Sequence, residues 1–263
     1  MHVSRLVLAC RNVKKGEIAR EAILAEGGSK SKTQIEVWEV DLESYASVRA
    51  SSERVRTPGT LERLDGVIAN AGIEMTSFEA SEGLERTLTV NVISTVMLCL
   101  GVLPKLTETA TTFGVTTRLK LVGSLIHYFG SDTQLASVPE SQSVFDALSD
   151  PKTAQMASRY SLSKLIEHLC FDQLVQRVEQ SDVIINLVNP GWCGMCRGLT
   201  DSRACTLADS LQVLTLDATR RRPSWKDCRS VCLAGLPSRG AERSCMVYAL
   251  EERLMGSICR NIW

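Results

Sequence analysis

The sequence predicts an α/β domain in which helices cover both faces of a doubly wound parallel sheet. Strand-like and helix-like segments alternate along the chain, an order that requires βαβ crossovers and parallel strands. The strand-like segments end in polar or glycine residues, which is typical of sheets that bind ligands at the carboxyl ends of their strands. A length of 263 residues is sufficient for one large domain with a substantial core.

The individual elements follow from the spacing of apolar residues. Short apolar or alternating runs predict strands, and apolar residues at helical spacing predict helices. We expect Pro104 to close the third helix. The strands are expected at 5–10, 34–40, 64–69, 119–122 and 183–188, and the helices at 13–24, 45–55, 82–106 and 160–178.

Composition restricts the partners and the compartment. The 30 basic and 30 acidic residues cancel, so no nucleic-acid partner is expected. The chain contains no run of about 18 apolar residues, which a membrane span would need. Its first residues lack the layout of a signal peptide. We therefore expect a cytoplasmic protein. Under those conditions, isolated cysteines are interpreted as small buried apolar residues, which applies to Cys10, Cys99 and Cys170.

Tyr160 and Lys164 provide the first chemical signal. They lie four positions apart in a predicted helix, so their side chains share one helix face. The ordinary pKa of a tyrosine, about 10, is too high for efficient proton transfer at neutral pH. A nearby ammonium group lowers the pKa of a phenol. Such a pair also occurs on many helices as solvated or packing residues, so further motifs are needed to support a catalytic role.

Those motifs are present, in order, over about residues 1–195, where the chain resembles the short-chain dehydrogenase/reductase family. The long segment between Ser124 and Tyr160 and the run at 189–194 resemble those of the family's retinol-dehydrogenase-like and fungal biosynthetic branch. The matching residues are Asn70-Ala71-Gly72 after a strand, Asn91 in the following helix, Ser124 at a strand end, the Tyr160-x-x-x-Lys164 motif, and Pro190-Gly191 after the last strand.

The resemblance implies a role for each catalytic residue. Tyr160 would give a proton to the substrate oxygen or take one from it, and Ser124 would hydrogen-bond that oxygen. Lys164 would lower the pKa of the tyrosine and hold the nicotinamide ribose. Asn91 would support a water-linked proton relay through the helix that it kinks. Hydride would pass between the nicotinamide and the substrate carbon.

The resemblance also implies the cofactor contacts. Asn70, Ala71, Gly72, Pro190 and Gly191 would join Tyr160 and Lys164 around the cofactor, and Asp41 would contact the adenine ring. Arg11 directly follows the first strand, where a guanidinium suits the 2′-phosphate of NADP. The same arginine could instead be a solvated residue at a strand end. NADP is the predicted cofactor, and no metal is predicted.

The chain departs from the family at its start. Members begin with a strand and a glycine-rich turn upstream of the segment at 5–10, and neither is found here. We expect a Rossmann-like sheet that lacks its first strand and phosphate-binding turn, as in an N-terminally truncated gene model or a degenerate relative. The missing strand is central in such a sheet. Its absence predicts exposed strand edges or a gap in the core.

Two further segments differ from the family pattern. Residues 1–195 are expected to form an incomplete domain, and 196–263 a divergent substrate-loop region of that domain, or translated intron. Met195 stands where the family usually has a threonine. Cys193-x-x-Cys196 and Cys228-x-x-x-Cys232 are interpreted as incidental rather than as a zinc site. The long spacing between Ser124 and Tyr160 predicts either a substrate flap or a surface loop.

The combined expectation is an NADP-dependent oxidoreductase that reduces a ketone or oxidises a secondary alcohol. The branch that the chain resembles suggests a polyketide- or terpenoid-derived small molecule and a place in secondary metabolism. The resemblance also implies a possible homo-oligomer, through the helix that carries Tyr160 and Lys164 and the preceding helix at 82–106. The alternative is a non-catalytic relative that does not bind the cofactor.

Overall fold

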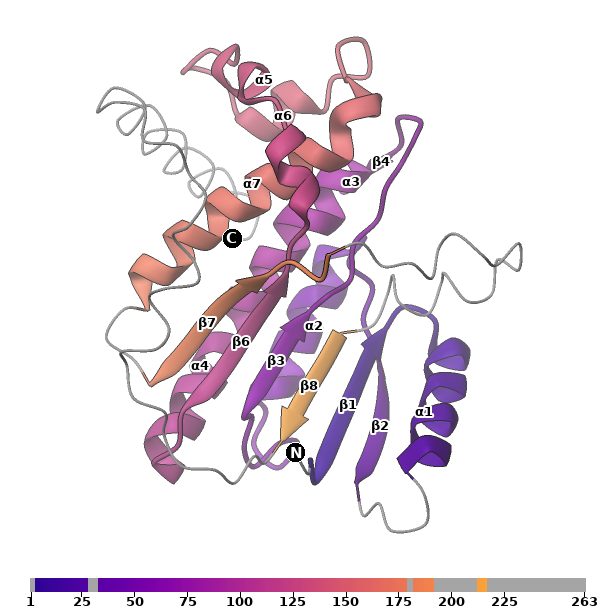
Figure 1. Ribbon diagram of the computed structural model, residues 1–263, viewed down its shortest axis with the longest axis vertical. Coiled ribbons are helices and arrows are strands. Elements are labelled where there is room, and N and C mark those ends of the chain that lie inside the picture. The colour runs from indigo at the N-terminus through magenta and orange to yellow at the C-terminus, as the bar shows by residue number, and fades with distance from the viewer. Residues whose placement is uncertain (1–2, 28–32, 179–181, 192–211, 217–263) are drawn as a thin grey trace.

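A computed structural model describes residues 3–27, 33–178, 182–191 and 212–216. Within these residues a six-stranded sheet has the order β2-β1-β8-β3-β6-β7 (Figure 1). The pairs β1–β2, β3–β6 and β6–β7 are parallel, which confirms the predicted fold class. The parallel strands are β1 (Arg5–Cys10), β2 (Gln34–Glu39), β3 (Gly66–Ala69), β6 (Thr117–Val122) and β7 (Val183–Val188).

Strand β8 (Gln212–Leu216) lies between β1 and β3 and runs antiparallel to both. Leu214 is opposite Val7 of β1 and Val67 of β3. The prediction of exposed edges or a gap at this position was therefore wrong. The physical reason is that unpaired strand edges accept a strand of either direction. The sheet is mixed at its centre, and the arrow of β8 points against those of its neighbours (Figure 1).

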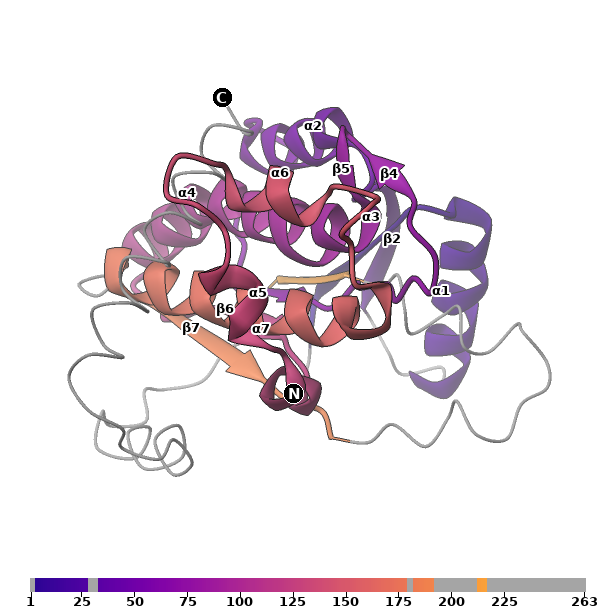
Figure 2. The same cartoon turned by 90° about the horizontal axis from the view of Figure 1, so that it is seen from above.

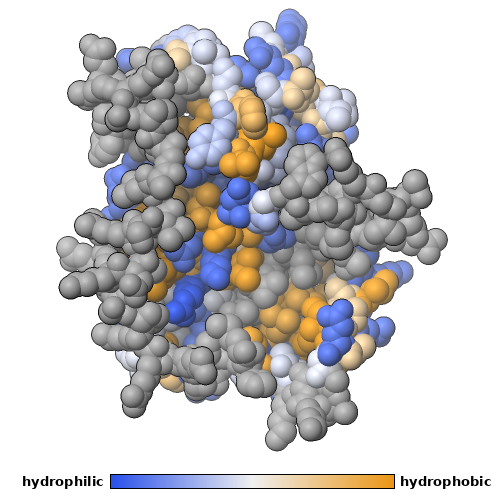
Figure 3. All heavy atoms as spheres, viewed as in Figure 1, coloured by the Kyte–Doolittle hydropathy of each residue, from blue (hydrophilic) through white to orange (hydrophobic). Residues whose placement is uncertain are grey.

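The helices lie on the two faces of the sheet, as Figure 2 shows from above. The helices α2 (Tyr45–Arg56), α4 (Thr95–Phe113) and α7 (Met156–Arg177) cover one face, and α1 (Val13–Gly27) packs beside β1 and β2 on the other. On the second face apolar side chains stay partly exposed (Figure 3). Ile184 and Val188 of β7 belong to this face by the two-residue alternation of a strand.

The segment predicted as one helix at 82–106 consists of several elements. The hairpin β4 (Ala80–Ser81) and β5 (Leu84–Glu85) precedes α3 (Arg86–Leu88), a π-helical turn η1 (Thr89–Ser94) and α4. Pro104 lies inside α4, so the prediction that it closes the helix was wrong. The helix ends instead at Gly114, whose φ of 61° is the left-handed conformation that glycine adopts without strain.

The residues from Arg86 to Phe113 are long and apolar enough to cross a membrane by length and composition. In the fold, 78% of the most apolar 18-residue part of this stretch is buried. The stretch therefore has the character of a core helix.

The segment between Ser124 and Tyr160 packs on the domain above the carboxyl ends of the strands (Figure 1). It contains η2 (Leu125–Phe129), α5 (Asp132–Ala136) and α6 (Val144–Leu148). Leu135 and Phe145 are 0% exposed. The segment is thus more than a surface loop, because it contributes side chains to the core, while a role as a substrate flap stays a prediction.

Candidate functional site

The carboxyl ends of the parallel strands bring the predicted site residues to one edge of the sheet. Arg11 follows β1, Asn70-Ala71-Gly72 follows β3, Ser124 follows β6, and Asn189-Pro190-Gly191 follows β7. Strands paired in parallel end at the same edge, so these loops lie on one side of the molecule. The segments at 125–155 and the first turns of α7 lie on the same side (Figure 1).

Lys164 is buried at the centre of this edge. Its side chain is 5% exposed, and Nζ donates to the carbonyl oxygen of Val122 at 3.1 Å and to Oε2 of Glu167 at 2.9 Å. A Cβ atom on Gly72 would lie 3.7 Å from this Nζ and 3.3 Å from Oδ1 of Asn91. The structure thus brings Lys164, Gly72 and Asn91 together, and glycine at position 72 permits this close approach.

Asn91 joins the loop after β3 to α7. Its Nδ2 donates to the carbonyl oxygen of Ile73 at 2.8 Å and to Oγ of Ser163 at 3.0 Å, and its Oδ1 accepts from the N–H of Ile73 at 2.8 Å. Ser163 in turn donates to the carbonyl oxygen of Tyr160 at 2.7 Å. Asn91 lies in the π-helical turn η1, a rare geometry that is frequent at functional sites.

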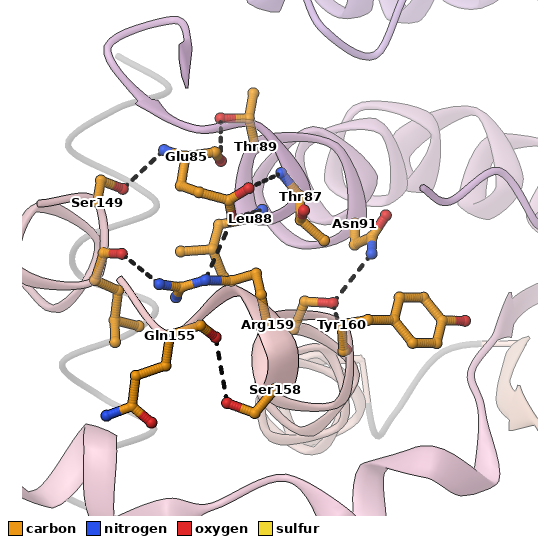
Figure 4. Close-up of polar contacts among 12 residues, drawn as sticks. Glu85, Thr87, Leu88, Thr89, Asn91, Ser149, Gln155, Ser158, Arg159 and Tyr160 are labelled. Atoms are coloured by element: carbon orange, nitrogen blue, oxygen red, sulfur yellow. Dashed lines mark hydrogen bonds and ion pairs between the residues drawn. The ribbon is translucent and has the colours of Figure 1, made fainter. Parts of the chain in front are cut away.

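Tyr160 and Ser124 are both half-buried beside this edge. Ser124 has extended backbone and starts η2, where its Oγ accepts from the N–H of Ile126 at 3.3 Å. In Figure 4 the ring of Tyr160 points away from the polar cluster around Arg159. Arg159, the residue before Tyr160 on α7, therefore contacts a different part of the structure from Tyr160 itself.

Arg159 and Glu85 form a buried ion pair that the sequence did not predict (Figure 4). Their side chains are 1% and 0% exposed, and Nε of Arg159 lies 3.5 Å from Oε2 of Glu85. Nη2 of Arg159 donates to the carbonyl oxygen of Leu148 at 2.7 Å, and the N–H of Glu85 donates to Oγ of Ser149 at 2.8 Å. Burial lowers the pKa of Arg159, while Glu85 opposes that change. Through these contacts Arg159 joins β5 and α6 to the start of α7.

Two histidines lie next to Ser124. The rings of His127 and His168 stack with centroids 4.8 Å apart, and Nδ1 of His127 is 2.7 Å from the carbonyl oxygen of Ser124. The stacking is a packing contact between η2 and α7. Burial lowers the pKa of His168, and the neighbouring His127 lowers it further.

The adenine end of the predicted cofactor site contains a network of charges. Arg11, whose side chain is 54% exposed, pairs with Glu43, and Glu43 also pairs with Arg86 at 2.7 Å. Oδ1 of Asp41 accepts from the N–H of Glu43 at 2.9 Å. The hydrogen bonds that Arg86 donates to the carboxylates of Glu43 and Glu79 raise the pKa of Arg86. Two guanidinium groups thus flank one carboxylate at the end of β1.

The residues around Lys164 fit a nicotinamide ribose. A lysine has three N–H donors, and two of those on Lys164 are used within the described part of the chain. The remaining donor suits a ribose hydroxyl. For the pyrophosphate the fit fails among the described residues, because β8 holds the central sheet position and runs antiparallel. It cannot lead into the helix N-terminus that binds phosphate in dinucleotide folds.

Some of the other predicted features lie within the described residues and some lie outside them. Gly191 has φ 76°, and its N–H donates to Oδ1 of Asn189 at 3.0 Å. Cys10, Cys99 and Cys170 are buried, as predicted. Met195 and the four cysteines of the zinc alternative lie outside the described residues. In the part that is described, no group of three or more potential metal ligands occurs.

Comparison with known proteins gives a family match and fungal relatives. The family described as "short chain dehydrogenase" matches residues 5–114. Short chain dehydrogenase atnD of Emericella nidulans is 36% identical over 196 residues, which cover 73% of this chain and 60% of that protein. Short chain dehydrogenase/reductase dmxR8 of Cryptosporiopsis is 37% identical over 72% of this chain and 58% of its own. The chain thus spans somewhat more than half the length of these relatives.

Solved structures with a similar arrangement include two cofactor complexes. A short-chain dehydrogenase from Sphingobium yanoikuyae in complex with NADPH is 20% identical, with a TM-score of 0.49 over 71% of this chain and 60% of its own. The NADH-dependent reductase A1-R′ complexed with NAD is 17% identical, with a TM-score of 0.49 over 73% of this chain and 80% of its own.

Proposed function

The chain belongs to the short-chain dehydrogenase/reductase family, and on that premise we propose that it is an oxidoreductase that uses NADP(H) to reduce a ketone or oxidise a secondary alcohol. One observation supports this most: Lys164, on the same helix face as Tyr160, is buried at the end of β6 beside Gly72 and Asn91. A solvated or packing Tyr/Lys pair has no reason to meet these residues.

The residues of the site divide the tasks of the proposed reaction among them. The phenol of Tyr160 gives a proton to the substrate oxygen during reduction and takes one during oxidation. The hydroxyl of Ser124 hydrogen-bonds the same oxygen and orients it. The ammonium group of Lys164 favours the phenolate form of Tyr160 and holds the ribose hydroxyls. The nicotinamide, when bound, supplies or accepts the hydride.

The choice of NADP rests on the charges after β1. Arg11 and Arg86 share the carboxylate of Glu43, and a guanidinium at this strand end suits a 2′-phosphate. A phosphate would compete with Glu43 for the two cations. A small polyketide- or terpenoid-derived substrate, a role in secondary metabolism and a cytoplasmic location remain predictions.

A second candidate function is favoured by β8. A non-catalytic relative would need no glycine-rich turn, and the central sheet position where that turn would start is held by an antiparallel strand. Retention of Ser124, Tyr160 and Lys164 favours the enzyme.

Replacement of Tyr160 tests the proposal. We expect the chain with NADPH to reduce at least one ketone in a panel of aromatic and alicyclic ketones, followed by the loss of NADPH absorbance. The variant Tyr160→Phe keeps the ring and loses the proton, so turnover should fall at least about 100-fold with NADPH affinity largely unchanged. Tyr128→Phe, an exposed tyrosine of η2, is the matched control. Equal turnover in wild type and Tyr160→Phe would refute the assigned role.

A further inference from the structure

Tyr160, Lys164 and Glu167 are spaced i, i+4 and i+7 along α7. This spacing places all three on one helix face, with the lysine between two acidic groups. The motif that carries the family resemblance ends at Lys164, so Glu167 is outside it. Position 167 would ordinarily hold a core apolar residue, because Ile166 and Cys170 beside it on the helix are 0% and 1% exposed.

Lys164 and Glu167 contact each other directly, and both side chains are buried from solvent. Nζ of Lys164 lies 2.9 Å from Oε2 of Glu167, and the side chains are 5% and 2% exposed. Two buried ions form a stable contact only when they compensate each other, since either one alone carries a desolvation penalty of several kcal/mol. Burial raises the pKa of Glu167, and Lys164 opposes this rise. The contact distance favours the ionised pair.

We propose that Glu167 is a positioning residue of the Tyr160/Lys164 site, whose carboxylate keeps the buried Lys164 amine protonated and fixes it at the end of β6. The inference rests on the proposed function only for the role of Lys164. An ammonium buried without a counter-ion loses its proton more easily. A neutral amine would no longer favour the phenolate form of Tyr160, so Glu167 would act on the chemistry through Lys164.

The other titratable groups around the pair do not replace Glu167 among the described residues. Cys99 of α4 faces it, and burial with the charge of Glu167 raises the pKa of this thiol, so the thiol stays neutral. On the side of η2, His127 stacks on His168, and the pKa of His168 is lowered by burial. The neutral form of His168 is therefore favoured above pH 7.

The test measures the charge of Lys164 in the free chain. Neutral amines react with acylating reagents and ammonium groups do not, so peptide mass spectrometry gives a labelling rate for each lysine. At a fixed pH near 8 we expect Glu167→Gln to accelerate labelling of Lys164 about tenfold, the change in neutral fraction for one pH unit. Glu167→Asp keeps the charge and should restore slow labelling. No cofactor or substrate is present, so a failure of the proposed function leaves the readout intact.

The chain provides a matched control. Lys105 and Glu108 on α4 form another i, i+3 pair at 2.8 Å, with Lys105 buried and Glu108 exposed. Glu108→Gln should leave Lys164 labelling unchanged, and Lys105 reports any general loosening of the fold. Unchanged Lys164 labelling in Glu167→Gln would overturn the proposal. Equal acceleration at Lys164 and Lys105 in that variant would also overturn it, because it would show a structural role alone.

If the Glu167→Gln variant does not fold, a second measurement on the wild-type chain still tests the proposal. In the wild-type chain the pH dependence of labelling reports the proton on each amine independently of access. Lys164 should start to react at a pH no lower than the exposed Lys14 and Lys15 of α1. If Lys164 instead reacts at a lower pH than these lysines, the carboxylate does not keep it charged, and the proposal is wrong.

Discussion

At the scale of single residues, His168 gives the fold a dependence on pH. Burial and the adjacent His127 lower the pKa of His168, and its Nδ1 is buried without a hydrogen-bond partner in the described part of the chain. The unfolded chain therefore binds a proton more readily than the folded chain. The free energy of unfolding should fall as the pH drops below the ordinary histidine pKa of about 6.5, and should not depend on His168 above it.

Chemical denaturation of wild type and His168→Gln between pH 8 and pH 5, values chosen to bracket that pKa of about 6.5, measures this effect. The variant should lose less stability than wild type as the pH falls, because it removes the titrating ring. Other acidic groups contribute equally to both proteins. Parallel curves for the two proteins would show that His168 is not the group responsible.

Candidate site residues could be chosen from the sequence, while the groups that contact them could not. Asn91, Tyr160 and Lys164 stand in recognisable motifs. The contact between the Glu167 carboxylate and Lys164 depends on tertiary packing. In sequence it is not distinctive, because a glutamate three positions after a lysine occurs on many exposed helices. Burial distinguishes this pair, and no local pattern encodes it.

At the scale of elements, the Arg159–Glu85 pair should anchor α6 and β5 to α7. Arg159→Met keeps the apolar stem and leaves Glu85 buried without its counter-ion. Removing one partner of a buried pair costs about 3–5 kcal/mol. Because Nε and Nη1 of Arg159 lack hydrogen bonds among the described residues, we expect the low end, about 3 kcal/mol, in urea unfolding.

Two variants make this prediction sharper. Arg20→Met breaks the exposed i, i+3 pair with Glu17 and should cost less than about 1 kcal/mol. The double variant Glu85→Gln with Arg159→Met removes the uncompensated charge and should recover part of the loss. A loss in Arg159→Met no larger than in Arg20→Met would show that the buried pair is not an anchor.

The parallel strands and the main helices were predictable because their apolar periodicity is strong. The internal structure of 82–106 was not, since a π-helical turn has no sequence signature and Pro104 is accommodated inside α4. The packing of the segment before Tyr160 also escaped prediction. Its core contribution includes Leu135 and Phe145, which lie in helices of five residues, too short to show a helical period.

At the scale of the whole molecule, β8 closes the sheet between β1 and β3. Sequence reasoning could find the open position but not its occupant, because the strand comes from a stretch without clear periodicity and pairs against the direction of its neighbours. A proline in a central strand removes a ladder hydrogen bond and clashes with the chain. Leu214, which is opposite Val7 and Val67, is the central residue of this strand.

Leu214→Pro should therefore destabilise the fold by more than about 3 kcal/mol, comparable to a proline in a helix interior. Urea unfolding measures this cost. Amide hydrogen exchange adds a readout in the wild type, where the amides of β8 should exchange as slowly as those of β3. Rapid exchange in β8 together with unchanged stability of the variant would mean that β8 is not part of the central sheet.

The central claim is that this chain binds NADP(H) at the edge formed by Arg11, Gly72, Tyr160 and Lys164. Titration of the 263-residue protein with NADPH and with NADH, followed by cofactor fluorescence, tests it most directly. The account predicts saturable binding of NADPH at least about tenfold tighter than NADH, as expected for a 2′-phosphate held by guanidinium groups. The absence of detectable binding of either cofactor would contradict it and favour the non-catalytic relative.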